Sequence, residues 1–105
     1  MSACILVLTT APSEKSARII SDQILKARLA ACVSIVPRIG SRYLWKGKRV
    51  GARESLLLIK APQKNYAKLQ RLIVKVHPYE VPEILAIPAL KGYAPYLRWL
   101  SQETR

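Results

Sequence analysis

The order of apolar patterns along the chain restricts its fold more than any other feature. Runs of β-forming residues predict strands, and apolar residues spaced three and four positions apart predict amphipathic helices between them. The predicted strands cover 3–9, 31–45 with interruptions at Pro37 and Gly40, a stretch whose apolar part is 54–60, and 84–87. The predicted helices cover 14–29, 62–76 and a short terminal segment, 96–100.

Lys46-Gly47-Lys48 predicts a tight turn between the second and third strands, which therefore form a long hairpin. The resulting order is βαββαβ followed by a C-terminal helix. Two right-handed βαβ crossovers that share a hairpin give an α+β, ferredoxin-like sandwich with both long helices on one face of an antiparallel sheet. The 105 residues suffice for one hydrophobic core, so we expect a single domain, 1–105.

Two features of this predicted sandwich indicate an oligomer. The helices can cover only one face of the sheet, yet the first three strands are apolar on both faces. The long hairpin, with Tyr43 and Trp45 near its tip, also has strand edges that a monomer would leave unpaired. We therefore expect the uncovered face and the hairpin to pack against other subunits.

The charge balance is strongly basic, with 18 Lys and Arg residues against 6 Asp and Glu and a net charge of +12. Such a charge attracts polyanions and anionic small molecules. Six of the cations lie between 38 and 53 beside two aromatic residues, which is typical of single-strand binding. The third strand, however, lacks the aromatic pattern of RNA-recognition domains. Nucleic acid is therefore not our expected partner, although a ligand site on the basic hairpin stays an alternative.

The segment 77–83, His-Pro-Tyr-Glu-Val-Pro-Glu, holds the only histidine of the chain. Pro78 and Pro82 disfavour helical dihedrals in the residues that precede them, so the segment is predicted to be an extended, rigid joint. Imidazole and carboxylate groups are ligands for copper, zinc and nickel, which makes a metal site one interpretation. The other is that His77 donates a hydrogen bond to a backbone carbonyl at the end of a helix.

Other classes of site have little support in the sequence. There is neither a Gly-x-Ser-x-Gly motif nor a glycine-rich phosphate loop, so we do not expect an enzyme. Cys4 and Cys32 lie in apolar runs and are expected to be buried free thiols. No apolar run reaches the roughly 18–20 residues of a membrane span. The first residues lack a basic region, so we interpret them as a strand and expect a cytoplasmic protein.

Several motifs together resemble those of the CutA divalent-cation tolerance proteins. The most specific is 77–83, and the others are 29–37, Tyr43-x-Trp45-Lys46-Gly47-Lys48, 54–60, Thr10-Ala11-Pro12 and Tyr96-Leu97-x-Trp99. The resemblance covers essentially the whole chain. It implies a ferredoxin-like protomer in a PII-like homotrimer that takes part in the response to metal ions. It further implies that the protein binds copper or another divalent cation without catalysing a reaction.

The resemblance also implies which residues form the site. His77 and Glu83 match residues of the family motif and are the predicted metal ligands, whereas Thr9 and Val76 replace a Cys and a second His that some members have. A cleft between subunits is expected as well, lined by Tyr43, Trp45, Glu54, Lys60 and Tyr79. Because the chain is so basic, a PII-like trimer that binds an anionic small molecule or nucleic acid is the alternative.

Overall fold

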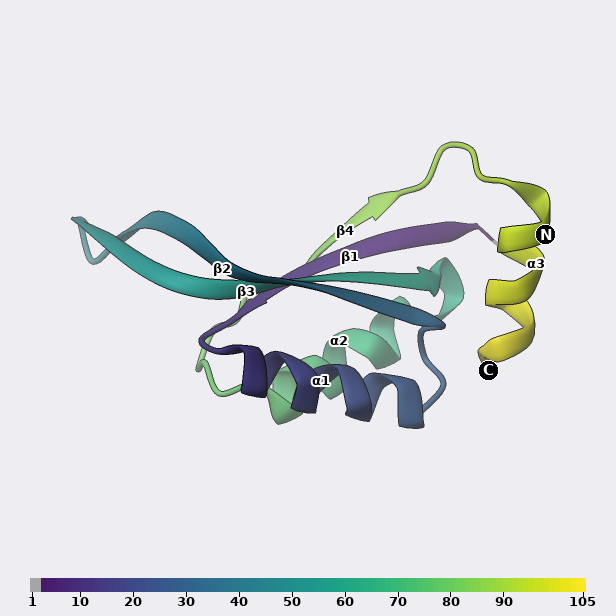
Figure 1. The fold of residues 1–105 in the computed structure, drawn as a ribbon, viewed down its shortest axis with the longest axis horizontal. Coiled ribbons are helices and arrows are strands. Elements are labelled where there is room, and N and C mark those ends of the chain that lie inside the picture. The colour runs from purple at the N-terminus through teal and green to yellow at the C-terminus, as the bar shows by residue number, and fades with distance from the viewer. Residues whose placement is uncertain (1–2) are drawn as a thin grey trace.

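The computed structural model describes residues 3–105, so residues 1 and 2 of the predicted domain lie outside the described range. Its elements are β1 Cys4–Ala11, α1 Glu14–Lys26, β2 Cys32–Trp45, β3 Lys48–Pro62, the 3₁₀ turn η1 Gln63–Asn65, α2 Tyr66–Val76, β4 Leu85–Pro88 and α3 Ala94–Glu103 (Figure 1). The strands form one antiparallel sheet in the order β2-β3-β1-β4. This order confirms the predicted ferredoxin-like sandwich.

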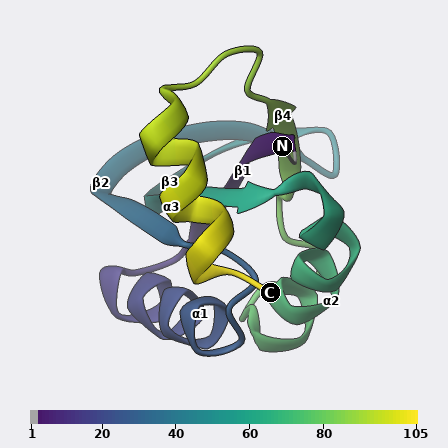
Figure 2. The same ribbon diagram turned by 90° about the vertical axis from the view of Figure 1, so that its right-hand side faces the viewer.

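The hydrophobic core lies between one face of the sheet and the helices α1 and α2, which lie side by side beneath it (Figure 2). The sheet contributes alternate residues, such as Val7 of β1 and Ile59 of β3, because successive side chains of a strand point to opposite faces. The helices contribute residues that recur every three or four positions, among them Ile24 and Leu69. No helix within 3–105 has the length and apolar character needed to cross a bilayer.

The opposite face of the sheet is apolar but only partly covered in the single chain. We call it the open face; its central residues are Leu6, Leu8, Leu58, Leu85 and Ile87. Leu85 and Ile87 of β4 are 58% and 47% exposed. Helix α3 lies across the end of the sheet farthest from the hairpin tip (Figure 1). Strand β1 is therefore apolar on both faces, but within one chain only its core face is fully buried.

The β2–β3 hairpin extends well beyond the rest of the molecule (Figure 1). Trp45 pairs with Lys48, and both intervening residues have positive φ, 52° at Lys46 and 78° at Gly47. Two central residues with positive φ define a type I′ turn, whose twist matches that of the strands. The predicted interruption of β2 is a bulge between Val36 and Ile39, whereas Gly40 pairs in register with β3.

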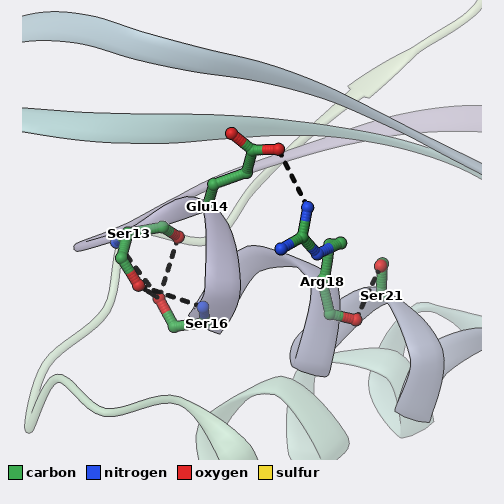
Figure 3. A network of polar contacts seen from close by, with 5 residues as sticks. All are labelled: Ser13, Glu14, Ser16, Arg18 and Ser21. Carbon is green, nitrogen blue, oxygen red and sulfur yellow. Dashed lines mark hydrogen bonds and ion pairs between the residues drawn. The ribbon is translucent and has the colours of Figure 1, made fainter.

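Helix α1 begins as expected and ends earlier. The Ser13 hydroxyl accepts from the Ser16 amide, and the Ser16 hydroxyl accepts from the Ser13 amide, so the two serines form a reciprocal cap (Figure 3). The helix was predicted to continue to residue 29, but it stops at Lys26 because Arg28 takes a left-handed conformation with φ of 57°. The Arg28 and Leu29 amides then donate to the carbonyls of the last turn.

The remaining helices differ from prediction at their ends. The first turn of the predicted helix 62–76 is the 3₁₀ turn η1, and the α-helical part begins only at Tyr66. Helix α3 extends beyond the predicted 96–100 at both ends; it begins at Ala94, with Pro95 in its first turn, where a missing amide proton costs nothing, and ends at Glu103. Strand β4 is shifted by one residue and includes Pro88.

The type I′ turn gives a stability prediction. Lys46 pays a steric cost for its positive φ that asparagine largely avoids, so Lys46→Asn should raise the free energy of unfolding by about 0.5–1 kcal/mol. Urea unfolding at one fixed protein concentration measures the change. Gly47→Ala is the control and should lower the same free energy by about 1 kcal/mol. A loss of stability in Lys46→Asn would contradict the assigned turn.

Candidate functional site

The site is built around the segment 77–83, which leads from α2 toward β4. His77 caps the end of α2 with extended dihedrals, and its side chain is only 7% exposed. Its Nε2 donates to the Thr10 carbonyl of β1 over 2.7 Å, and its Nδ1 accepts from the Tyr79 amide over 3.0 Å. The carbonyl can only accept and the amide can only donate, so these contacts define the neutral Nε2–H tautomer.

Tyr79 ties the same segment to the sheet at a second point. Its hydroxyl donates to Glu54 Oε2 of β3 over 2.6 Å, and Glu54 is 7% exposed. Burial of the phenol, followed by its hydrogen bond to Glu54 and the negative charge of that carboxylate, raises the pKa of Tyr79 well above its ordinary value. The hydroxyl therefore stays protonated and keeps donating to the buried carboxylate far into the alkaline range.

An open cleft of about 930 Å³ lies between the hairpin and the segment 77–83. The bulge in β2 determines which hairpin side chains reach it. Val36 pairs with Leu56, but after the bulge Ile39 pairs with Glu54, so odd-numbered residues of β2 then share a face with even-numbered residues of β3. This change of face places Tyr43 and Trp45 in the cleft with Glu54.

The cleft holds half of the acidic side chains of the protein. Glu54, Glu80 and Glu83 line it, and the last two are exposed. Within 3–105, none of these three carboxylates has a Lys or Arg nitrogen within 4.0 Å, because the two ion pairs there lie elsewhere, at Glu14 and Glu103. Arg42 and Lys46 also line the cleft without such pairing. In so basic a chain, three acidic side chains without a cationic partner are an unusual concentration of available oxygen ligands.

The predicted site residues are only partly brought together. Four of the five predicted cleft residues line the cleft, as does Glu83; these are Tyr43, Trp45, Glu54 and Tyr79. Lys60 does not line it. It lies six residues from Glu54, about 20 Å along the strand, where its ammonium group donates to Ser34 Oγ and contacts Cys32 Sγ at 3.7 Å.

Arg42, Lys46 and Glu80 line the cleft but were not among the predicted site residues. The basic run of the hairpin and the acidic residue inside the segment 77–83 were the available signals, but neither showed that the two segments face each other.

The single chain does not supply a complete metal site. Among residues 3–105 no group of three or more His, Cys, Asp or Glu side chains is close enough to hold one ion. Both nitrogens of His77 are engaged, and burial raises the pKa of the Cys4 thiol, which disfavours the thiolate that binds soft metals. Thr9 is fully buried on the core face, and its hydroxyl has no hydrogen-bond partner in the described part of the chain. The carboxylates of the cleft fit a cation better than the buried groups do.

Comparison with known proteins identifies the family and the relatives of this chain. The family described as "CutA1 divalent ion tolerance protein" matches residues 5–103. The chain belongs to this family. The divalent-cation tolerance protein CutA of Thermus thermophilus is 46% identical over 99 residues, which cover 94% of this chain and 96% of that protein. The mouse protein CutA is 43% identical over 90% of this chain, but the chain spans only 54% of its length.

The solved structures agree with this assignment. The divalent cation tolerance protein Cut A1 from Thermus thermophilus superposes with a TM-score of 0.94 at 44% identity, covering 97% of this chain and 99% of that one. CutA1 from Oryza sativa superposes with a TM-score of 0.96 at 38% identity, covering 99% and 95%. The CutA1 relationship therefore extends over the whole described fold, including the hairpin and the segment 77–83.

The Tyr79–Glu54 contact gives a prediction about stability. Tyr79→Phe removes the only side-chain donor to the buried Glu54 carboxylate within residues 3–105, so we expect the free energy of unfolding to fall by about 1–3 kcal/mol. Tyr93→Phe, which alters an exposed phenol that makes no hydrogen bond among the described side chains, is the matched control. Chemical unfolding at pH 7 compares the variants with the wild type.

The same pair of proteins should differ in pH dependence. A raised pKa in the folded state means that the Tyr79 contribution is complete below pH 10, the ordinary phenol pKa, and is lost as the pH rises toward the raised value. The stability difference between wild type and Tyr79→Phe should therefore be constant up to about pH 10 and shrink above it. A difference that grows above pH 10 would refute the assigned hydrogen bond.

Proposed function

We propose that this protein takes part in the response to metal ions by binding a divalent cation, without catalysing a reaction, as a homotrimer. Membership of the CutA1 divalent ion tolerance family supports a role connected with divalent cations. One observation of this structure supports the location: three acidic side chains that have no cationic partner among residues 3–105 line a single cleft. The bound ion would supply positive charge to these carboxylates.

The carboxylates of Glu83 and Glu80 are the ligands that we propose in the cleft, because both are exposed on the segment 77–83. Copper is the metal we expect to bind most tightly, since affinities of divalent first-row ions for a given site generally peak at copper. One carboxylate oxygen of Glu54 accepts a hydrogen bond from Tyr79, so Glu54 would contribute negative charge near the ion without binding it directly. His77 has the role of a positioning residue that fixes the segment on β1.

A trimer would complete this site. The cleft lies on the same side of the sheet as the open face. Glu54, Leu56 and Leu58 follow one another at intervals of two residues along β3, so their side chains point to the same face. A neighbouring subunit that covers the open face would therefore stand beside the cleft and could bring further ligands. Burial of the exposed Leu85 and Ile87 provides the hydrophobic driving force for this packing. The cytoplasmic location stays a prediction.

An anionic small molecule or a nucleic acid bound through the basic hairpin is the second candidate. The observation that favours it is that Arg42 and Lys46 line the cleft unpaired beside two aromatic side chains. Neutralising a basic or an acidic side chain of the cleft would have opposite effects on the binding of an anion and of a cation. Arg42→Gln should weaken binding of an anion and leave or improve binding of a cation, whereas Glu83→Gln should do the reverse.

Titration of Cu²⁺ by calorimetry tests the proposed ligand. We expect Glu83→Gln to lower the affinity by at least about tenfold, because the neutral amide loses the charge that attracts the ion; this loss corresponds to roughly 1.4 kcal/mol. Glu14→Gln makes the same chemical change outside the cleft and should leave the affinity unaltered. His77→Ala should lower the free energy of unfolding, whereas the folded variant should keep most of its affinity for Cu²⁺.

Equal Cu²⁺ affinities in wild type, Glu83→Gln and Glu14→Gln would show that the cleft is not the site. If His77→Ala alone abolished binding while remaining folded, the imidazole would be the ligand and the positioning role would be wrong.

Light scattering tests the trimer. The wild type should have three times the chain mass of 11.8 kDa. Ile87→Lys puts a charge on the open face and should give a folded monomer, because an unpaired charge in an apolar interface is costly. Ile19→Lys makes the same change at a 49% exposed position of α1, on the other side of the sheet, and should remain trimeric. A monomeric wild type would contradict the proposal.

A further inference from the structure

The outer surface of α1, η1 and α2 carries half of the net charge of the chain. This surface, which we call the helix layer, comprises residues 14–28 and 63–76. Its basic residues are all exposed: Lys15, Arg18, Lys26, Arg28, Lys64, Lys68, Arg71 and Lys75. Only two acidic residues, Glu14 and Asp22, accompany these eight cations, so the helix layer has a net charge of +6 out of +12.

Most of these cations have no carboxylate partner. Arg18 pairs with Glu14 over 2.9 Å (Figure 3), and Arg28 approaches Glu103 at 4.0 Å. The other six basic side chains of the helix layer have no Asp or Glu oxygen within 4.0 Å in the described part of the chain. Residues 63–76 contain no acidic residue at all. Their positive charge is therefore available to an external anion.

Three cations of α2 form a stripe on a helix whose other side is anchored in the core. Lys68, Arg71 and Lys75 follow one another at intervals of three and four residues, so they share one side of the helix. The opposite side packs into the core through Leu69 and Ile73, which are fully buried. At 1.5 Å per residue the stripe is about 10 Å long, which is the axial rise of roughly three phosphates on one strand of a duplex.

The aromatic residues of the chain distinguish among polyanionic partners. Single-stranded nucleic acid is held by stacking of bases on exposed aromatic side chains. Surfaces that dock on membranes commonly insert aromatic side chains at the interface. The only aromatic residue of the helix layer is Tyr66, which is not exposed, and both tryptophans lie on the hairpin and on α3. Contacts to a duplex backbone need cations alone.

We propose that the helix layer binds the phosphate backbone of double-stranded nucleic acid without reading its sequence. The helices lie on the opposite side of the sheet from the open face (Figure 2), so oligomer formation through the open face would leave the helix layer accessible. Several copies in one oligomer would add their helix layers and strengthen attachment to a long duplex. This inference is independent of the proposed cation site.

Fluorescence anisotropy with a labelled 20-base-pair duplex of mixed sequence, at 50–200 mM salt, tests the proposal. The triple variant Lys68→Gln, Arg71→Gln, Lys75→Gln should bind at least about tenfold more weakly at 100 mM salt. The slope of log affinity against log salt should become shallower by about 2.7, at roughly 0.9 per lost phosphate contact. Glutamine has a similar helix propensity, so the fold should be retained, as circular dichroism can verify.

A second triple variant removes three charges from the hairpin, Lys48→Gln, Arg49→Gln, Arg53→Gln, and should keep most of the affinity. Equal losses in the two variants would mean that net charge alone drives binding and would overturn the assignment to the helix layer. Absence of duplex binding by the wild type at 50 mM salt would overturn it as well. So would tighter retention on single-stranded DNA or on vesicles with anionic lipids than on the duplex.

Discussion

The hydrogen bonds of His77 and Tyr79 determine how the second half of the chain returns to the sheet. His77 Nε2 holds the end of α2 on the Thr10 carbonyl of β1, and the Tyr79 hydroxyl holds the next turn on Glu54 of β3. The segment was predicted to be extended, but residues 78–81 form a bend, although Pro78 and Pro82 within the segment still restrict the backbone of the residues that precede them. The segment 77–83, which forms one wall of the cleft, is therefore positioned by two side-chain contacts that also stabilise the fold.

The distribution of charge follows from the same architecture. Within residues 3–105, acidic side chains without a cationic partner gather in the cleft, whereas basic side chains, most of them without a carboxylate partner, cover the hairpin and the helix layer. A cation that approaches such a chain is repelled at long range, and only local carboxylates can hold it. The acidic side chains of the cleft suit a cation, and the basic helix layer suits an anion. The two surfaces lie on different sides of the sheet.

Local sequence signals predicted the strands, the two long helices and the hairpin turn, because each depends on neighbouring residues; the fold then followed from the order of these elements. The end of α1 was wrong because Arg28, where glycine is usual, takes the left-handed conformation. The bulge was predicted near Pro37, but a sequence cannot show that it turns Tyr43 and Trp45 toward Glu54. Lys60 was assigned to the cleft by the family resemblance alone; it shares a sheet face with Glu54 but lies six residues farther along β3, too far to line the same cleft. A hydrogen bond from His77 to a backbone carbonyl was one interpretation of the sequence, but its acceptor, Thr10, lies 67 positions away and could be identified only from the structure.

In the proposed arrangement, His77 positions the segment 77–83 while the cleft carboxylates hold the cation. Anomalous X-ray diffraction from crystals of the protein soaked in Cu²⁺ would locate the ion. We expect an anomalous peak beside the Glu83 carboxylate, with both His77 hydrogen bonds intact. A peak at bonding distance, about 2.0 Å, from an imidazole nitrogen of His77, with its contact to Thr10 or Tyr79 broken, would show that this arrangement is wrong.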